Sequence, residues 1–246
     1  MTDYYGELCT KIYEIDKSYS KGIELDFYLS FVKDPNMKVL EPMCGNGRML
    51  IPFMQKGISI EGFDISEEML KVCKEKAEKL NLKPNIYFEK IEEFKGNNTY
   101  DLIIIPFGSF SLLPDALVYK SLSNLKSALK SEGKLLLTIM LKYDGIEEIP
   151  EWMELEQIQF DDELIVSYKK VHYDVEESML TNQLKYESVK NGHIKKTEIM
   201  DFPIRLYDLE EFENTLKSNG LENIVVHSVK DGYGEGTLFY VIECST

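Results

Sequence analysis

The sequence predicts a doubly wound α/β sheet that carries a small antiparallel β insertion. From Met37 to Met140, short apolar segments alternate with amphipathic helical segments, as in parallel strands joined by helices. Between Trp152 and Tyr207, strand-like segments follow one another with little room for helices. Asn191-Gly192 in that stretch is a strong signal for a β-hairpin.

Composition and charge exclude several classes of protein. The chain has 246 residues, 43% of them hydrophobic and 29% charged, as in an ordinary globular protein with a sizeable core. Its net charge of −15 argues against general electrostatic binding of nucleic acid or an anionic membrane. The N-terminus lacks an apolar signal core and no run of 18 apolar residues occurs, so we expect a cytoplasmic protein. The four cysteines are scattered without ligand spacing, which predicts reduced thiols and no metal site.

The expected elements follow from hydrophobic periodicity and turn residues. Two short helices are expected within 3–33, and Asp208 is expected to cap a helix that ends near Asn219. Tyr100–Ile105 is a continuous apolar run of the kind buried on both faces of a parallel sheet. The expected strands of the main sheet are 37–41, 58–63, 85–88, 100–105, 134–140, 221–229 and 237–244, and the helix after the first strand is expected at about 46–56.

These elements divide the chain into four segments. We expect a helical lid over 1–36 and a ligand-binding α/β core over 37–149. The antiparallel insertion is expected over 150–207, and 208–246 adds the last helix and two closing strands to the core. The lid is rich in tyrosine, a residue that suits a cover over a ligand.

A glycine turn after the first strand is the main candidate site. Gly45 and Gly47 let the backbone approach a ligand closely, and the N–H groups that follow favour an anionic group. A dinucleotide fingerprint would place a third glycine at Leu50, so a nicotinamide cofactor is disfavoured. Glu41 lies beneath the turn, placed to meet a cationic amino group.

A second acid, Asp64, ends the second strand 17 residues after Gly47. A carboxylate there points into the crevice at the carboxyl ends of the strands, where a ribose diol can donate two hydrogen bonds. An amino-acid head group plus a ribose describes S-adenosylmethionine.

At these residues the chain resembles the class I S-adenosylmethionine-dependent methyltransferases. The first motif of that family, acid-x-x-x-Gly-x-Gly, is matched by Glu41, Gly45 and Gly47, and its ribose-binding acid by Asp64. Tyr100–Ile104 resembles its fourth-strand motif, and Leu129–Leu135 resembles the approach to its fifth strand. The resemblance covers about 37–141 and 208–244. It implies a Rossmann-like, doubly wound sheet of seven strands, with S-adenosylmethionine as cofactor.

The resemblance also implies the residues of the cofactor site. Lys90 stands where the family commonly has an acid that contacts the adenine amino group, which leaves the Ile91 backbone and apolar packing for that role. Met43 stands where the family has a small residue. The candidate cofactor-binding residues are Tyr13, Tyr19, Glu41, Met43, Gly45, Gly47, Asp64, Ile65, Met69, Ile91 and Pro106.

The acceptor side is expected to lie near the end of the fourth strand and under the insertion. Phe107 and Phe110 are the candidate substrate contacts, because the family places residues there between cofactor and acceptor. The alternating face that carries Leu164, Val166 and Tyr168 is expected to roof the acceptor in part. His172 is the first candidate for a general base, should the acceptor need one.

Three functions fit these patterns. The first is methyl transfer to the nitrogen or oxygen of a small molecule by direct in-line displacement, in a monomer or homodimer that binds neither nucleic acid nor membrane. This interpretation resembles the subgroup with an antiparallel insertion after strand five, which includes amine and aminosugar N-methyltransferases. The alternatives are a protein or RNA methyltransferase, and a non-catalytic protein that binds S-adenosylmethionine.

Overall fold

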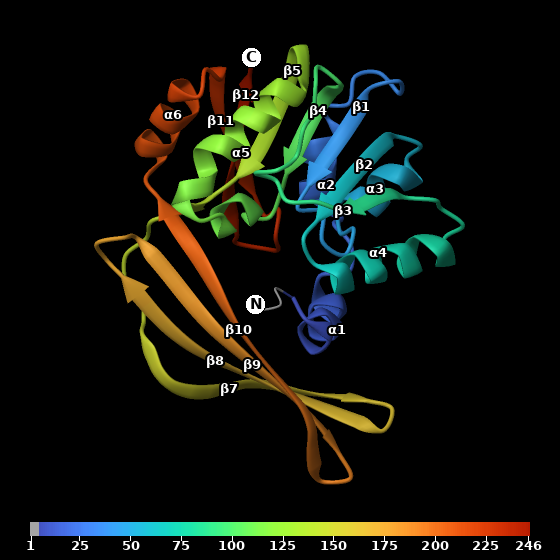
Figure 1. Cartoon of the computed structure of the whole chain (residues 1–246), viewed down its shortest axis with the longest axis vertical. Coiled ribbons are helices and arrows are strands. Elements are labelled where there is room, and N and C mark those ends of the chain that lie inside the picture. The colour runs from blue at the N-terminus through green and yellow to red at the C-terminus, as the bar shows by residue number, and fades with distance from the viewer. Residues whose placement is uncertain (1–4) are drawn as a thin grey trace.

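The computed structural model describes residues 5–246 and arranges them in two sheets, one below the other in Figure 1. The upper sheet has seven strands in the order β11-β12-β5-β4-β1-β2-β3, and the lower has five in the order β6-β10-β9-β8-β7. The strands are β1 (Lys38–Pro42), β2 (Ser59–Asp64), β3 (Asn85–Phe88), β4 (Tyr100–Ile105), β5 (Leu129–Thr138), β6 (Met140–Leu141), β7 (Ile149–Phe160), β8 (Glu163–Asp174), β9 (Met179–Lys190), β10 (His193–Tyr207), β11 (Glu222–Lys230) and β12 (Leu238–Ser245).

Helices cover both faces of the upper sheet, as a doubly wound fold requires. Consecutive residues of β4 point to opposite faces, so Ile103 packs with α5 and α6 while Leu102 packs with α2, α3 and α4. The predicted fold class is therefore confirmed. The helices are α1 (Glu7–Asp16), α2 (Gly22–Leu29), α3 (Leu50–Gln55), α4 (Glu67–Lys79), α5 (Asp115–Ala128) and α6 (Leu209–Ser218), with a 3-10 turn η1 (Ser109–Leu112).

The last two strands form the expected hairpin within the main sheet. β11 pairs with β12 antiparallel, and β12 pairs antiparallel with β5, so the hairpin closes one edge of an otherwise parallel sheet. Among the described residues, no helix combines the length and the apolar character needed to cross a membrane.

The helix after the glycine turn is shorter than predicted. It was expected over 46–56, but α3 begins only at Leu50. Met43, Gly45 and Gly47 have φ angles of 59°, 53° and 75°, in the left-handed region that a right-handed helix cannot contain. The backbone therefore stays in turns up to Met49, which keeps it irregular at the candidate site.

The insertion is an antiparallel sheet of four long strands, β7 to β10, and β6 adds a short parallel pair with β10. Asn191 and Gly192 form the turn between β9 and β10, with φ angles of 53° and 73°, as the sequence indicated. In Figure 1 the helix α1 lies between the two sheets, near β9 and β10.

The two faces of the insertion differ in what covers them. On the inward face, Ile165, Tyr186 and Met200 pack against Leu8 and Cys9 of α1. Alternation along β8 then places Leu164, Val166 and Tyr168 on the outward face. These three residues thus lie on the face away from α1, and their neighbours point inward, so their position does not support the expectation that they roof an acceptor.

Candidate active site

The glycine turn follows β1 and packs closely against α4. A Cβ atom on Gly47 would lie 2.4 Å from the Cys73 sulfur, so only glycine fits at this φ of 75°. A Cβ atom on Gly45 would meet no atom within 4 Å. The turn is thus held by packing at Gly47, whereas the backbone at Gly45 has free space beside it that a ligand could occupy.

Asp64, at the carboxyl end of β2, is linked directly to this turn. Its Oδ2 accepts a hydrogen bond of 2.8 Å from the Gly45 N–H, and its Oδ1 accepts one of 2.8 Å from the Ser66 N–H. Burial raises the pKa of Asp64, against the effect of these backbone donors. Ser66 caps α4 through the Met69 N–H, which fixes the start of that helix beside the carboxylate.

Glu41 lies beneath the turn with only 3% of its surface exposed. Its Oε2 is buried and has no hydrogen-bond partner among the described residues. Burial raises the pKa of Glu41 well above its usual range; Glu24 and Asp64 raise it further, and Arg48 lowers it. Because an unpaired buried carboxylate oxygen is costly, the position suits a ligand that brings a positive charge or a donor. The amino group of S-adenosylmethionine fits this requirement.

Arg48 and Glu24 form a buried pair beside the turn that sequence reasoning missed. The guanidinium donates two hydrogen bonds to the Glu24 carboxylate, of 2.9 and 2.6 Å, and Glu24 is fully buried. The same guanidinium stands 4.4 Å from the centre of the Phe107 ring. An arginine directly after Gly47, and an acid at Glu24 in the mostly apolar helix α2, were the signals that could have found this pair.

The candidate tyrosines of the lid occupy different places. Burial raises the pKa of Tyr13 to about 12, and the charges of Arg48, Glu24 and Glu41 also act on it, so its phenol lies near the glycine turn. Tyr5 packs edge-on against Tyr13, with ring centres 5.8 Å apart. Tyr19 is 39% exposed and has the Lys76 amine of α4 over its ring. Tyr13 is therefore better placed than Tyr19 to reach a ligand at the turn.

The residues expected at adenine, Ile65 and Ile91, follow β2 and β3, and the cofactor candidate Met69 lies in α4. Ile65 is 43% exposed, so its side chain is open to an apolar ligand. Met69 and Ile91 are buried, and the Ile91 carbonyl accepts a hydrogen bond of 3.1 Å from the Asn124 amide. Lys90 points to solvent and pairs with Glu93 at 3.0 Å.

The segment after β4 turns sharply beyond the buried Pro106. Phe107 and Gly108 have left-handed φ angles of 62° and 73°, and the Gly108 N–H donates to the Thr138 hydroxyl of β5. Phe107 remains partly exposed at the turn. Phe110 instead enters the core, where it is fully buried and its ring centre lies 5.8 Å from that of Phe212. The prediction that Phe110 contacts the substrate is therefore wrong, because the turn directs η1 inward.

His172 does not lie with the other candidates. Its neighbours Val171 and Tyr173 pack on the inward face of the insertion, so His172 projects from the outward face. Its side chain is 72% exposed and pairs with Glu148 at 3.0 Å. This arrangement argues against a general base at this position.

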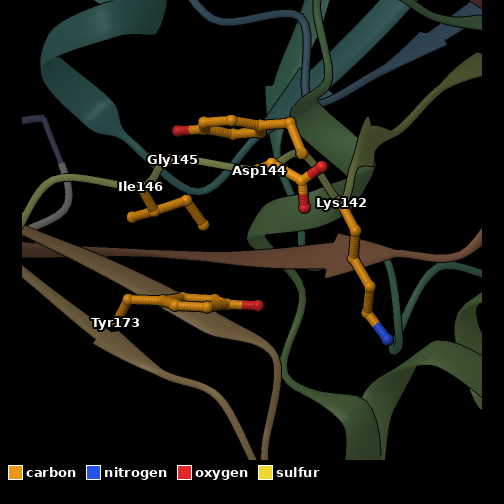
Figure 2. Close-up of a pocket in the computed structure, with 6 residues that line it drawn as sticks. Lys142, Asp144, Gly145, Ile146 and Tyr173 are labelled. Atoms are coloured by element: carbon orange, nitrogen blue, oxygen red, sulfur yellow. The ribbon is translucent and has the colours of Figure 1, made fainter.

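A cavity of about 510 Å³ lies where the segment after β6 passes the inward face of the insertion. Figure 2 shows Ile146 and Tyr173 at its wall, and beside them the Asp144 carboxylate and the Lys142 amine. Ile146 and Tyr173 also pack against Val171 of β8, on the same face that α1 covers farther along. The lining residues are Lys142, Tyr143, Asp144, Gly145, Ile146 and Tyr173.

Comparison with known sequences gives matches over the core. A family model described as a methyltransferase domain matches residues 33–205. A Geobacillus protein named as a methyltransferase is 27% identical over 107 residues, which are 43% of this chain and 43% of that protein. A tRNA (guanine(10)-N2)-dimethyltransferase of Pyrococcus abyssi is 29% identical over 119 residues, covering 45% of this chain and 36% of that one. The matches thus span less than half of the length of these two relatives.

Solved structures match over nearly the whole chain. An S-adenosylmethionine-dependent methyltransferase from Clostridium acetobutylicum has a TM-score of 0.72 at 19% identity, covering 96% of this chain and 97% of that one. The sugar N-methyltransferase KedS8 from Streptoalloteichus has a TM-score of 0.72 at 13% identity, covering 100% and 97%. These similarities establish the fold. The chain belongs to the methyltransferase-domain family, with the class I fold that its glycine turn and its two strand-end carboxylates predicted.

Proposed function

We propose that the chain binds S-adenosylmethionine at the carboxyl ends of β1, β2 and β4 and transfers its methyl group to a nitrogen or oxygen of a small molecule. The observation that carries this proposal is the Glu41 carboxylate, buried beneath the glycine turn with one oxygen unpartnered. Asp64 stands beside it, joined to the Gly45 N–H of the same turn.

Each residue of the cofactor side has a role that its chemistry supports. Glu41 receives the cationic amino group, and Asp64 accepts from the two ribose hydroxyls. The open backbone at Gly45 permits close approach. Ile65 packs on the adenine and Tyr13 covers the amino-acid end. Arg48 is held in place by two hydrogen bonds to Glu24, and its charge offsets part of the negative charge around Glu41.

Bound S-adenosylmethionine supplies a methyl group already activated by a positively charged sulfur. The protein therefore has to align the acceptor with the methyl group and exclude water. The proposed reaction therefore needs neither a pair of catalytic carboxylates nor a Ser-His-Asp arrangement. An amine acceptor needs only to arrive deprotonated, whereas a hydroxyl acceptor would favour a base.

The acceptor side is proposed to lie against the inward face of the insertion, between α1 and the cavity of Figure 2. Along this face, Lys169 of β8 lies diagonal to Asn182 of β9, and Asn182 pairs with Phe202 of β10 at the edge of the cluster that α1 covers. A polar amide, an amine and an aromatic ring suit a small polar molecule with an apolar side. The sugar N-methyltransferase of similar fold supports such an acceptor.

A macromolecular acceptor is the second candidate. The partial match to a tRNA methyltransferase favours RNA, but the net charge of −15 opposes binding of a polyanion. A protein acceptor has no such electrostatic penalty. The small-molecule interpretation is therefore preferred over RNA.

The test is methyl transfer from labelled S-adenosylmethionine. The acceptor arms are a panel of small amines, aminosugars and hydroxyl compounds, bulk tRNA, and unfractionated protein. We expect label in at least one small-molecule arm, with stoichiometric release of S-adenosylhomocysteine. Label only in tRNA or protein would overturn the proposed acceptor class. Binding without turnover in every arm would favour a non-catalytic protein, and absence of binding would overturn the proposal as a whole.

A further inference from the structure

The helix α1 connects the cofactor side of the molecule to the insertion, and Glu198 of β10 holds its N-terminal end. We propose that Glu198 is a positioning residue of the methyltransferase: by fixing α1, it holds the lid over the cofactor and couples cofactor binding to the insertion. This inference rests on the proposed function, because the site that α1 covers is the proposed cofactor site.

The joint at the N-terminal end of α1 is built from a side chain of the insertion. Glu198 Oε2 accepts hydrogen bonds from the Leu8 N–H at 2.8 Å and from the Cys9 N–H at 3.3 Å. α1 has no side-chain cap of its own at Gly6, so a residue almost 190 positions away supplies the cap. A negative charge at this end also interacts favourably with the helix dipole.

The contact between Gly6 and the Glu198 carboxylate is close and leaves no room for a larger residue at position 6. The Glu198 side chain is 17% exposed and pairs with Lys196 at 2.7 Å. A Cβ atom on Gly6 would lie 2.8 Å from Glu198 Oε2, so glycine is what allows the carboxylate to approach the helix. Lys196 also pairs with Glu7 at 2.9 Å.

The other end of α1 is joined to the glycine turn. Glu14 accepts a hydrogen bond of 2.7 Å from the Asn46 amide, which lies between the two glycines, and pairs with Lys76 of α4 at 3.0 Å. Tyr13 precedes Glu14 and lies near Arg48 and Glu41. The ten residues of α1 therefore connect β10 to the turn without a break.

Tyr5 extends the same connection. Its ring packs edge-on against Phe202 of β10 at 5.6 Å and against Tyr13 at 5.8 Å. Its carbonyl accepts a hydrogen bond of 3.0 Å from the Ser66 hydroxyl, next to Asp64. A shift of β10 would thus be transmitted through Tyr5 to Tyr13 and to the Ser66 hydroxyl, both of which lie at the proposed cofactor site.

A connection of this kind acts in both directions. If the position of β10 affects cofactor affinity, then bound cofactor must stabilise the joint between β10 and α1 by the same free energy. The apolar cluster of Leu8, Ile165 and Met200 remains when Glu198 is changed, so the fold is expected to survive while the orientation of α1 loosens.

The experiment compares E198Q with E187Q in the full chain. Glu187 is a matched control: its side chain is 16% exposed and pairs with Lys185 at 2.9 Å, but it lies on the outward face of β9. Calorimetry with S-adenosylhomocysteine measures affinity, and hydrogen exchange measures protection of α1 and β10 with and without that ligand. G6A is a second variant, since its methyl group displaces the same carboxylate from the other side.

We expect E198Q and G6A to weaken binding of S-adenosylhomocysteine by roughly three- to tenfold, the range for loss of a charged helix cap. In both, ligand-induced protection of β10 should fall, and E187Q should match the wild type. A merely structural role would lower thermal stability without changing affinity in the folded protein. Wild-type affinity and ligand-induced protection in E198Q and G6A would overturn the inference. If the wild type itself fails to bind S-adenosylhomocysteine, the proposed function fails instead.

Discussion

The two sheets of this protein hold their functional surfaces in different ways. In the upper sheet both faces are covered by helices, and the residues at its carboxyl edge are joined across long distances in sequence, as Asp64 is to Gly45 and Asn46 to Glu14. In the lower sheet the described contacts with the rest of the protein lie on the inward face, at its two ends, where α1 and the segment after β6 pack.

This difference corresponds to the two tasks of a group-transfer enzyme, which are to bind the cofactor and to select the acceptor. The residues of the proposed cofactor side are joined to one another by hydrogen bonds within the protein, which limits the ordering that binding requires. The proposed acceptor side has fewer fixed contacts and a wider choice of side chains along the inward face. Selectivity for the acceptor is therefore expected to lie in the insertion, and cofactor affinity in the upper sheet and the lid.

The largest expected effect follows from disturbing the packed turn of the upper sheet. In G47A the new methyl group would lie 2.4 Å from the Cys73 sulfur at a left-handed φ, so the free energy of unfolding should fall by about 2–4 kcal/mol. G45A is the control for backbone conformation alone and should cost about 1 kcal/mol, because its methyl group meets nothing. Denaturant unfolding measures both. Equal losses in the two variants would show that packing against α4 does not hold the turn.

A smaller effect of opposite sign is expected at Glu41. The pKa of Glu41 is higher in the folded protein than in the unfolded chain, where it is near 4.5. The protonated carboxyl therefore contributes fully to the free energy of unfolding below pH 4.5, and this contribution is lost as the pH rises through the pKa of the folded protein. E41Q cannot ionise, so its stability relative to the wild type without ligand should increase with pH, by about 1–2 kcal/mol at pH 8.

The same substitution should weaken cofactor binding about tenfold, because the partner of the cationic amino group loses its charge. Thermal unfolding at several pH values and ligand titration measure the two effects separately. If E41Q binds the cofactor with wild-type affinity, Glu41 is not part of the cofactor site, whatever the stability of E41Q.

The smallest effect is expected on the outward face of the insertion. His172 is exposed and pairs only with Glu148 among the described residues, so H172N should retain a methyl-transfer rate within about twofold of the wild type. A loss of about 100-fold or more would instead indicate a general base. That result would place the acceptor on the outward face and reverse the assignment of the two faces.

The sequence predicted the upper sheet well because its signals are local and repeated. Apolar runs such as Tyr100–Ile105 and the cap at Ser66 depend on neighbouring residues, and the structure confirms the fold that they predict. The pairing of Arg48 with Glu24 joins residues whose contact depends on how α2 packs. No periodicity encodes such a contact.

The insertion was harder to predict in detail. Alternation shows that a strand has two faces, but not which face meets the rest of the protein, and Leu164 lies on the face away from α1. Phe110 was misplaced for a related reason, since the left-handed pair Phe107-Gly108 reverses the chain into the core. The cap that Glu198 gives α1 depends entirely on tertiary structure.

Calorimetric titration of S-adenosylhomocysteine into D64A and D101A tests the central claim most directly. Asp101 is a matched control, because its carboxylate also accepts a backbone N–H, from Lys38 at 2.8 Å, but it lies at the amino end of the parallel strands. We expect D64A to weaken binding by about tenfold or more, through loss of the acceptor for two hydroxyls, and D101A to bind within about twofold of the wild type. Unchanged affinity in D64A would contradict the account of the cofactor site.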